Sequence, residues 1–253
     1  MVMKMYQNNS YKLFLSLVII GIIIGFSVGC FIFSYKVEQN VSSTITTYSN
    51  NPNFYQTEIN LVAVDQDGNG VITPLIVEIK SGNGKALTNI DKLLFWVDTQ
   101  QSIQIAKNVA ENVTGINASD YDLTYSIESN ATLIGGPSAG AALTIATVAA
   151  LERKTLKDDV MITGTINPDG TVGAVGGILE KARAAKEEGA KLFLVPSGQS
   201  EQTYLQPVEN CVRRGGLLWC QTTYNQITVN IGKDVGISVI EIDNIKDAIK
   251  YFI

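Results

Sequence analysis

The sequence of 253 residues contains no histidine, and this absence excludes several kinds of chemistry. A Ser-His-Asp triad, a Cys-His dyad, a His-Glu-x-x-His zinc helix and a Cys2His2 zinc finger all need an imidazole as a base or a ligand. The three cysteines, Cys30, Cys211 and Cys220, are too few and too far apart for a four-thiolate zinc or iron–sulfur site. A hydrolase with this sequence must therefore use another base.

Basic side chains are in the minority. The chain carries 19 lysine and arginine residues against 24 aspartate and glutamate residues, which gives a formal net charge of −5. Proteins that bind nucleic acid usually present a basic face to the phosphate backbone. The charge balance therefore predicts no nucleic-acid partner. The length of the chain is sufficient for one or two domains with a hydrophobic core.

An uncharged, apolar segment lies near the N-terminus, at residues 13–33 (LFLSLVIIGIIIGFSVGCFIF). A helix rises about 1.5 Å per residue, so this segment would span roughly 30 Å of hydrocarbon. A cleaved signal peptide is the alternative, but the run exceeds the usual apolar stretch of about 7–15 residues and no Ala-x-Ala-like site follows it. The segment therefore predicts one transmembrane helix.

The charges that flank this segment predict its orientation. Lys4, Lys12 and the α-amino group precede it, whereas only Lys36 follows it before Lys80. Positive charge near a transmembrane helix favours the cytoplasmic side. We therefore expect residues 1–12 to form a cytoplasmic tail and the rest of the chain to lie outside, with the protein in the cell membrane as a single-pass protein.

Two cysteines outside the apolar segment flank a predicted turn. Cys211 and Cys220 lie on either side of residues 213–216 (RRGG) and can form a disulfide in an oxidising compartment. Two free thiols are the alternative that the sequence leaves open.

Residues 34–57 are rich in Ser, Thr and Asn without apolar periodicity, which predicts a polar stalk. From residue 58 onward, β-branched runs and amphipathic segments alternate irregularly, which predicts an α+β domain of mixed architecture. The expected strands are residues 58–64 and 71–79 (a hairpin), 121–128, 159–164, 171–175, 191–195 and 236–242. The expected helices are residues 99–113, the alanine-rich segment up to about 151, 178–188 and 244–252.

Two loops imitate ligand-binding motifs without completing them. Residues 65–70 (DQDGNG) open like a calcium-binding EF-hand loop, but Ile76 occupies the position of the bidentate glutamate. Residues 82–85 (GNGK) resemble the end of a phosphate loop, but Ile79 replaces the first glycine and Ala86 replaces the final Ser/Thr. We therefore expect no metal, no cofactor and no ATP site.

The first candidate for chemistry is the glycine-rich segment 135–140 (GGPSAG), which precedes the alanine-rich helix. Its glycines let a backbone approach closely, and Pro137 suits the first turn of a helix. Ser138 then lies at a helix N-terminus, where unpaired N–H groups favour a developing oxyanion. An ordinary serine N-cap and a phosphate-binding helix end are the alternatives.

The second candidate is Lys181, within residues 175–181 (VGGILEK) and one turn into a predicted helix. Most lysines are solvated, but a serine nucleophile in a chain without histidine needs a lysine or an acid as its base. Burial lowers the pKa of a lysine because desolvation disfavours the ammonium form. The adjacent glycines and small residues would let other parts of the chain pack closely around the amine of Lys181 and exclude water from it.

Four segments, taken in order, resemble the proteolytic domain of Lon proteases, the family of Ser-Lys dyad peptidases. They are residues 136–140 (GPSAG), residues 159–164 (DVMITG), Gly170 and residues 175–181 (VGGILEK). The similarity covers residues 58–253. It implies a Lon-protease-like mixed α/β domain, with a fold like that of the second domain of ribosomal protein S5.

The resemblance implies that Ser138 is the nucleophile and Lys181 the general base, with Thr163 near the lysine. A direct hydrogen bond would place Ser138 Oγ about 2.6–3.2 Å from Lys181 Nζ, although longer separations are common without substrate. The other members of the serine motif are expected to support the site: Gly136, Pro137, Ala139 and Gly140.

The sequence also departs from the Lon pattern. Lon proteases typically carry an AAA+ unfoldase before this domain, whereas residues 1–57 offer an anchor and a stalk without a Walker motif. Gly135 replaces the acid often found three residues before the serine. Residues 197–234 are expected to be an insertion. Because family members commonly form hexameric rings, a homo-oligomer is the assembly that the resemblance implies.

These observations together predict a membrane-anchored, ATP-independent serine endopeptidase that cleaves unfolded or flexible protein segments. Two alternatives from other classes remain open. One is a non-catalytic interaction module that retains the Lon-type fold. The other is a nucleotide-binding domain like those of small-molecule kinases, in which Lys181 has no evident role.

Overall fold

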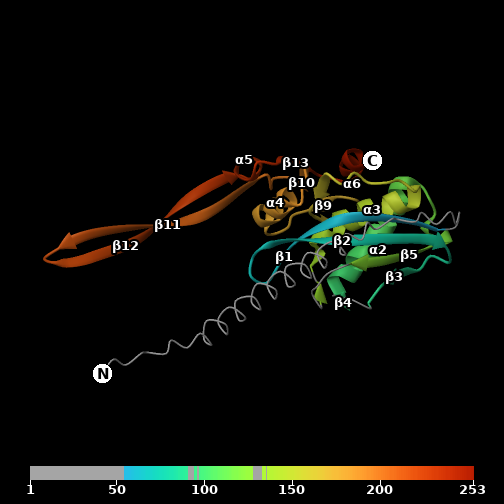
Figure 1. The fold of residues 1–253 in the computed structure, drawn as a ribbon, viewed down its shortest axis with the longest axis horizontal. Coiled ribbons are helices and arrows are strands. Elements are labelled where there is room, and N and C mark those ends of the chain that lie inside the picture. Colours follow the sequence, from blue (N-terminus) through green and yellow to red (C-terminus); the bar gives the residue numbers. More distant parts are fainter. Residues whose placement is uncertain (1–53, 91–93, 96, 128–132, 135) are drawn as a thin grey trace, which may run out of the picture. The chain divides into compact units, whose positions relative to one another are not determined.

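The computed structural model describes residues 54–90, 94–95, 97–127, 133–134 and 136–253 (Figure 1). The predicted tail, the predicted transmembrane helix at residues 13–33 and most of the predicted stalk lie outside these residues. Among the helices that are described, none combines the length and the apolar character needed to cross a membrane.

The first sheet has four strands in the order β1-β2-β5-β3. β1 and β2 form the predicted antiparallel hairpin, β5 is antiparallel to β2, and β3 is parallel to β5. The strands are β1 (Phe54–Val64), β2 (Gly70–Ser81), β3 (Ala86–Thr88) and β5 (Tyr121–Ile127). β1 begins before the expected start at residue 58, because Thr57 is already buried, so residues 54–57 belong to the sheet and not to the stalk.

The side chain of Asp65 stabilises the turn between β1 and β2. Asp65 Oδ1 accepts hydrogen bonds from the backbone N–H groups of Asp67 (3.0 Å) and Asn69 (2.7 Å). An aspartate that bonds backbone groups a few residues ahead is a common turn-forming device. The carboxylate of Asp65 therefore shapes the turn. No group of three potential metal ligands occurs in the described part of the chain.

Two helices pack against this sheet, α2 (Val97–Thr114) and α3 (Gly140–Glu152). α3 is buried on every side from Gly140 to Leu151, as expected for a helix that is apolar all round. Its many alanines let the neighbouring elements approach closely. The sheet contributes alternate residues to the shared core: Leu75, Val77 and Ile79 from β2, and Leu123, Tyr125 and Ile127 from β5.

The second sheet is parallel, with its strands in the order β13-β10-β7. Parallel strands need crossover connections, and helices supply them here. A second apolar cluster, which includes Met161, Ile178 and Phe193, joins this sheet to α4. The elements are β7 (Val160–Ile162), β10 (Leu192–Pro196), β13 (Ser238–Ile242), α4 (Ile178–Glu187), α5 (Ile231–Val235) and α6 (Ile245–Phe252).

Short elements complete the α+β architecture that the sequence predicts. β8 and β9 pair antiparallel, and β4 and β6 pair parallel. These elements are β4 (Leu94–Phe95), β6 (Leu133–Ile134), β8 (Thr165–Ile166), β9 (Val172–Gly173) and two 3-10 turns, η2 (Ala118–Asp120) and η3 (Pro137–Ala139).

Most of the predicted insertion at residues 197–234 is one long β-hairpin. Its strands are β11 (Glu201–Arg214) and β12 (Leu217–Asn230), which pair antiparallel with each other and form their own two-stranded sheet. A disulfide joins Cys211 to Cys220, so the pairing that the sequence left open is present. The hairpin is drawn in orange in Figure 1, and most of its side chains are exposed.

Candidate active site

Ser138 lies in the 3-10 turn η3, directly before α3. Gly136 precedes this turn with a φ of 108°, a conformation that side chains other than glycine rarely adopt. Ala139 is the N-cap of α3, without a side-chain hydrogen bond, so the interpretation of Ser138 as an ordinary N-cap is wrong. The Ser138 side chain is therefore not used for capping and lies half-buried at the end of the core helix.

Two backbone hydrogen bonds fix the serine loop to the chain that follows β7. The carbonyl of Ser138 accepts from the N–H of Gly164 at 3.0 Å, and the N–H of Ala141 donates to the carbonyl of Gly164 at 3.0 Å. Gly140 packs so closely on β8 that a Cβ atom there would lie 2.7 Å from the nitrogen of Ile166. The predicted supporting glycines are thus required by geometry, and the serine has little freedom to shift.

Lys181 lies in the first turn of α4 and is only 3% exposed. Its Nζ donates to Thr163 Oγ1 at 3.2 Å. None of the ion pairs found among the described residues involves Lys181. Burial therefore acts without a compensating carboxylate, and it lowers the pKa of Lys181 from 10.5 to about 8.

Thr163 connects the lysine to the serine segment. It is fully buried just after β7, and its hydroxyl, which accepts from Lys181, also donates to the backbone carbonyl of Ser138 at 3.4 Å. The predicted proximity of Thr163 and Lys181 is confirmed. The direct hydrogen bond between Ser138 Oγ and Lys181 Nζ is not present among the described residues. Lys181 Nζ donates to Thr163 Oγ1 instead.

The position of α4 depends on two glycines. Gly177 is the N-cap of α4 and has a φ of 67°, which favours glycine. Gly70, at the start of β2, lies against the helix backbone, and a Cβ atom there would come within 2.1 Å of the carbonyl oxygen of Glu180. The hairpin of the first sheet thus packs directly against the backbone of α4, one residue before Lys181.

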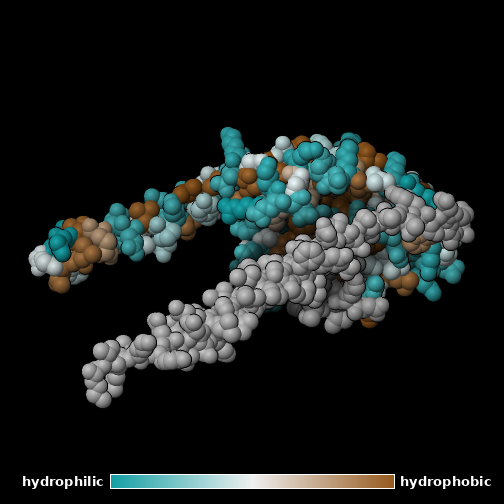
Figure 2. All heavy atoms as spheres, in the orientation of Figure 1, coloured by the Kyte–Doolittle hydropathy of each residue, from teal (hydrophilic) through white to brown (hydrophobic). Residues whose placement is uncertain are grey.

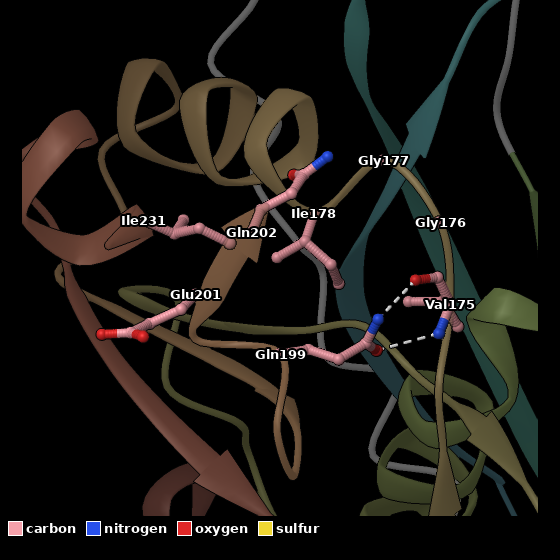
Figure 3. A pocket seen from close by; sticks show the side chains of 8 residues that line it. All are labelled: Val175, Gly176, Gly177, Ile178, Gln199, Glu201, Gln202 and Ile231. Atoms are coloured by element: carbon pink, nitrogen blue, oxygen red, sulfur yellow. Dashed lines mark hydrogen bonds between the residues drawn. The ribbon is translucent and has the colours of Figure 1, made fainter. Parts of the chain in front are cut away.

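A glutamine side chain holds the segment that leads into α4. Gln199 Oε1 accepts from the N–H of Val175 at 2.9 Å, and its Nε2 donates to the carbonyl of the same residue at 2.7 Å (Figure 3). A cavity of about 140 Å³ lies beside this contact. It is lined by Val175, Gly176, Gly177, Ile178, Gln199, Glu201, Gln202 and Ile231.

Asp98 is a site residue that the sequence reasoning missed. Its carboxylate, in the first turn of α2, accepts from the N–H of Gly136 at 3.0 Å and from the N–H of Thr99 at 2.8 Å. The carboxylate therefore fixes the backbone two residues before Ser138. The available signal was an acidic residue just before a predicted helix, which is a common N-capping position.

A known protein family matches the part of the chain that contains this site. The model of the Lon protease (S16) C-terminal proteolytic domain matches residues 97–228, which is more than half of the chain. The chain belongs to this family. The predicted resemblance is confirmed at the level of the family, and the match runs from the start of α2 into β12.

Individual relatives match part of the chain. Lon protease 2 of Bacillus subtilis (strain 168) is 28% identical over 167 residues, which is 60% of this chain and 29% of that protein. The archaeal Lon protease of Thermococcus kodakarensis is 26% identical over 156 residues, 59% of this chain and 24% of that protein. A Lon protease of Vibrio parahaemolyticus is 39% identical over 103 residues, 38% of this chain and 13% of that protein. The chain thus spans less than a third of the length of these relatives.

The bond from Asp98 to Gly136 predicts an effect on the reactivity of Ser138. Asp98→Ala removes a charge-assisted hydrogen bond, so the serine should react with a fluorophosphonate roughly 10- to 100-fold more slowly. The loss of the two hydrogen bonds that the Asp98 carboxylate accepts should also lower the free energy of unfolding by about 1 kcal/mol. The measurements are the second-order labelling rate and the unfolding curve of the full chain.

Two variants control this experiment. Asp98→Asn keeps one acceptor oxygen and should recover part of the labelling rate. Asn108→Ala changes an exposed residue on the same helix and should leave the rate unchanged. A wild-type labelling rate in Asp98→Ala would refute the positioning role.

Proposed function

We propose that this protein is a serine endopeptidase in which Ser138 is the nucleophile and Lys181 is the general base. The observation that carries the proposal is the burial of Lys181 without a carboxylate partner in the described part of the chain, which brings the pKa of its amine to about 8. A lysine with that pKa is partly neutral near physiological pH and can accept a proton. Membership of the Lon proteolytic family supports this reaction class.

The proposed mechanism uses the side chain of Ser138 and the backbone N–H groups of the turn that carries it. Ser138 Oγ attacks the peptide carbonyl, Lys181 takes the hydroxyl proton, and the same proton then passes to the leaving amine. The oxyanion is proposed to be held by backbone N–H groups of the turn η3, from Ser138 and Ala139. These two donors, at the N-terminal end of the buried helix α3, are suited to hold the oxyanion.

Thr163 is proposed to position Lys181 relative to Ser138. Its hydroxyl accepts from Lys181 Nζ and lies within reach of the Ser138 backbone. In the proposed mechanism, Lys181 exchanges this partner for Ser138 Oγ when substrate is bound. Apo active sites often show such looser contacts.

The substrate is proposed to be an unfolded or flexible protein segment. Hydrolysis by these 253 residues is proposed to proceed without ATP, because they contain no Walker motif. The cavity beside α4, of about 140 Å³, is smaller than the roughly 300–1,000 Å³ of typical small-molecule sites. Its size suits one side chain of a peptide better than a nucleotide.

A homo-oligomeric ring is also part of the proposal, because the family resemblance implies it.

The proposed location is the outer side of the cell membrane, with residues 13–33 as the anchor. The Cys211–Cys220 disulfide supports this location, since disulfides persist mainly in oxidising compartments. The charges before the apolar segment favour the same orientation.

The first test of the function is cleavage of casein and fluorophosphonate labelling by the full chain. Ser138→Ala and Lys181→Ala should each lower kcat/KM by roughly 1,000-fold or more, because nucleophile and base act as a unit. Lys186→Ala, an exposed lysine on the same helix, is the matched control and should keep full turnover.

Each alternative function predicts a different outcome of that test. A non-catalytic module would leave the wild type without cleavage and without labelling at Ser138. A nucleotide-binding domain would gain thermal stability on addition of ATP and magnesium. Full turnover in either dyad variant would overturn the assignment of the residues.

The lowered pKa of Lys181 predicts the pH dependence of activity. The neutral amine is the active base, so kcat/KM should rise with pH through a value of about 8, roughly tenfold between pH 7 and pH 9. No histidine titrates in this range. The α-amino group does, so the profile should be repeated with an acetylated N-terminus. A flat profile from about pH 6 to pH 9 would contradict the lysine base.

A further inference from the structure

The end of the β11–β12 hairpin carries exposed apolar side chains. We define the hairpin tip as residues 212–214 and 217–219, which flank the turn at residues 215–216. Within the tip, Val212 pairs with Trp219, Arg213 with Leu218, and Arg214 with Leu217. Figure 2 shows brown, hydrophobic spheres at this end of the hairpin. The exposed fractions are 55% for Val212, 66% for Leu217, 66% for Leu218 and 65% for Trp219.

The tip is basic although the protein as a whole is acidic. Residues 210–221 (NCVRRGGLLWCQ) include Arg213 and Arg214 and no aspartate or glutamate. The whole chain, in contrast, has a formal net charge of −5. Positive charge is therefore concentrated beside four exposed apolar side chains, which is the composition of a surface that meets an anionic, partly apolar partner.

The tip is held in one conformation. Gly215 and Gly216 have φ values of 57° and 82°, and a tight hairpin turn with two positive φ angles needs such glycines. The Cys211–Cys220 disulfide crosses the two strands directly behind the tip. The apolar side chains are thus presented on a rigid support, although no packing among the described residues requires them there.

A lipid surface fits this tip better than a protein partner does. A stable protein interface usually takes about 20–30 residues on each side, whereas the tip is a narrow end of two strands with six side chains. Insertion into a bilayer interface needs only a few apolar side chains, and tryptophan favours the headgroup level. Each arginine near an anionic surface adds further attraction.

We propose that the hairpin tip inserts into the interfacial region of an anionic lipid bilayer. Val212, Leu217, Leu218 and Trp219 enter the boundary between headgroups and acyl chains, and Arg213 and Arg214 contact the lipid phosphates. This contact is separate from the anchor predicted at residues 13–33 and does not depend on the peptidase activity. Each strand has 14 residues, or roughly 45 Å of extended chain, so the contact sets the distance of the catalytic domain from the membrane.

The test uses the fluorescence of Trp219 in the full chain, reconstituted into vesicles of phosphatidylcholine with or without about a third of phosphatidylglycerol. Lipids brominated along the acyl chain quench tryptophan that enters the bilayer. The difference between wild type and Trp219→Phe isolates this residue from Trp96. We expect quenching of Trp219 and a blue-shifted emission in the anionic vesicles.

Two further variants locate the contact. Trp219→Phe/Tyr224→Trp moves the reporter five positions along β12 towards the hairpin base, to another exposed site, where quenching should fall by at least half. Arg213→Gln/Arg214→Gln should lower the quenching of Trp219 in anionic vesicles by at least half, and added salt should have the same effect. Ser138→Ala should quench like the wild type, which separates this proposal from the catalytic one.

Three results would overturn the proposal. The first is unquenched Trp219 emission in both kinds of vesicle. The second is an emission shift that follows protein concentration at constant lipid, which would identify a second copy of the chain as the partner. The third is a shift that appears only on addition of unfolded casein, which would identify the tip as a substrate-binding surface.

Discussion

The burial of Lys181 next to the hydroxyl of Thr163 is the interaction on which the candidate site depends. No ion pair among the described residues compensates the buried ammonium, so folding favours the neutral amine and the pKa falls to about 8. By linkage, the unfolded chain holds this proton more tightly, so the free energy of unfolding rises as pH increases from about 8 towards about 10.4. Below that window the buried charge costs stability. The protein tolerates this cost at the one position where the proposed chemistry needs a base.

The rest of the fold brings three separate elements to this lysine. Ser138 lies at the start of the buried helix α3, Thr163 follows β7, and Lys181 is in the first turn of α4. The close approach of Gly70 to the backbone of α4 links the first sheet to the lysine helix. The hydrogen bonds between Ser138, Ala141 and Gly164 link the serine turn to the second sheet. The site is therefore formed where the two sheets and their helices meet.

Much of this arrangement could be predicted from the sequence, because the motifs are local. The segments at residues 136–140 and 175–181, with Thr163 between them, indicated the serine, the lysine and their neighbour. Asp98 was missed because its bond to Gly136 spans 38 residues, and an N-capping signal does not reveal a second, distant partner. The strands β11 and β12 were missed because both of their faces are exposed, so no alternation of apolar and polar residues marks them. The sequence indicated the turn between Cys211 and Cys220 but left their pairing open, and it did not reveal the long hairpin that carries them.

The most direct test of the central claim is the pKa of Lys181 itself, measured by NMR on the full chain with isotopically labelled lysine side chains. The Lys181 signal is assigned by its loss in Lys181→Met, and its chemical shift is followed as pH rises. The account predicts a midpoint at about 8, well below the roughly 10.4 of a solvated lysine. A midpoint at or above the value for a solvated lysine would contradict it, because the amine would then be protonated at the pH at which it must act as a base.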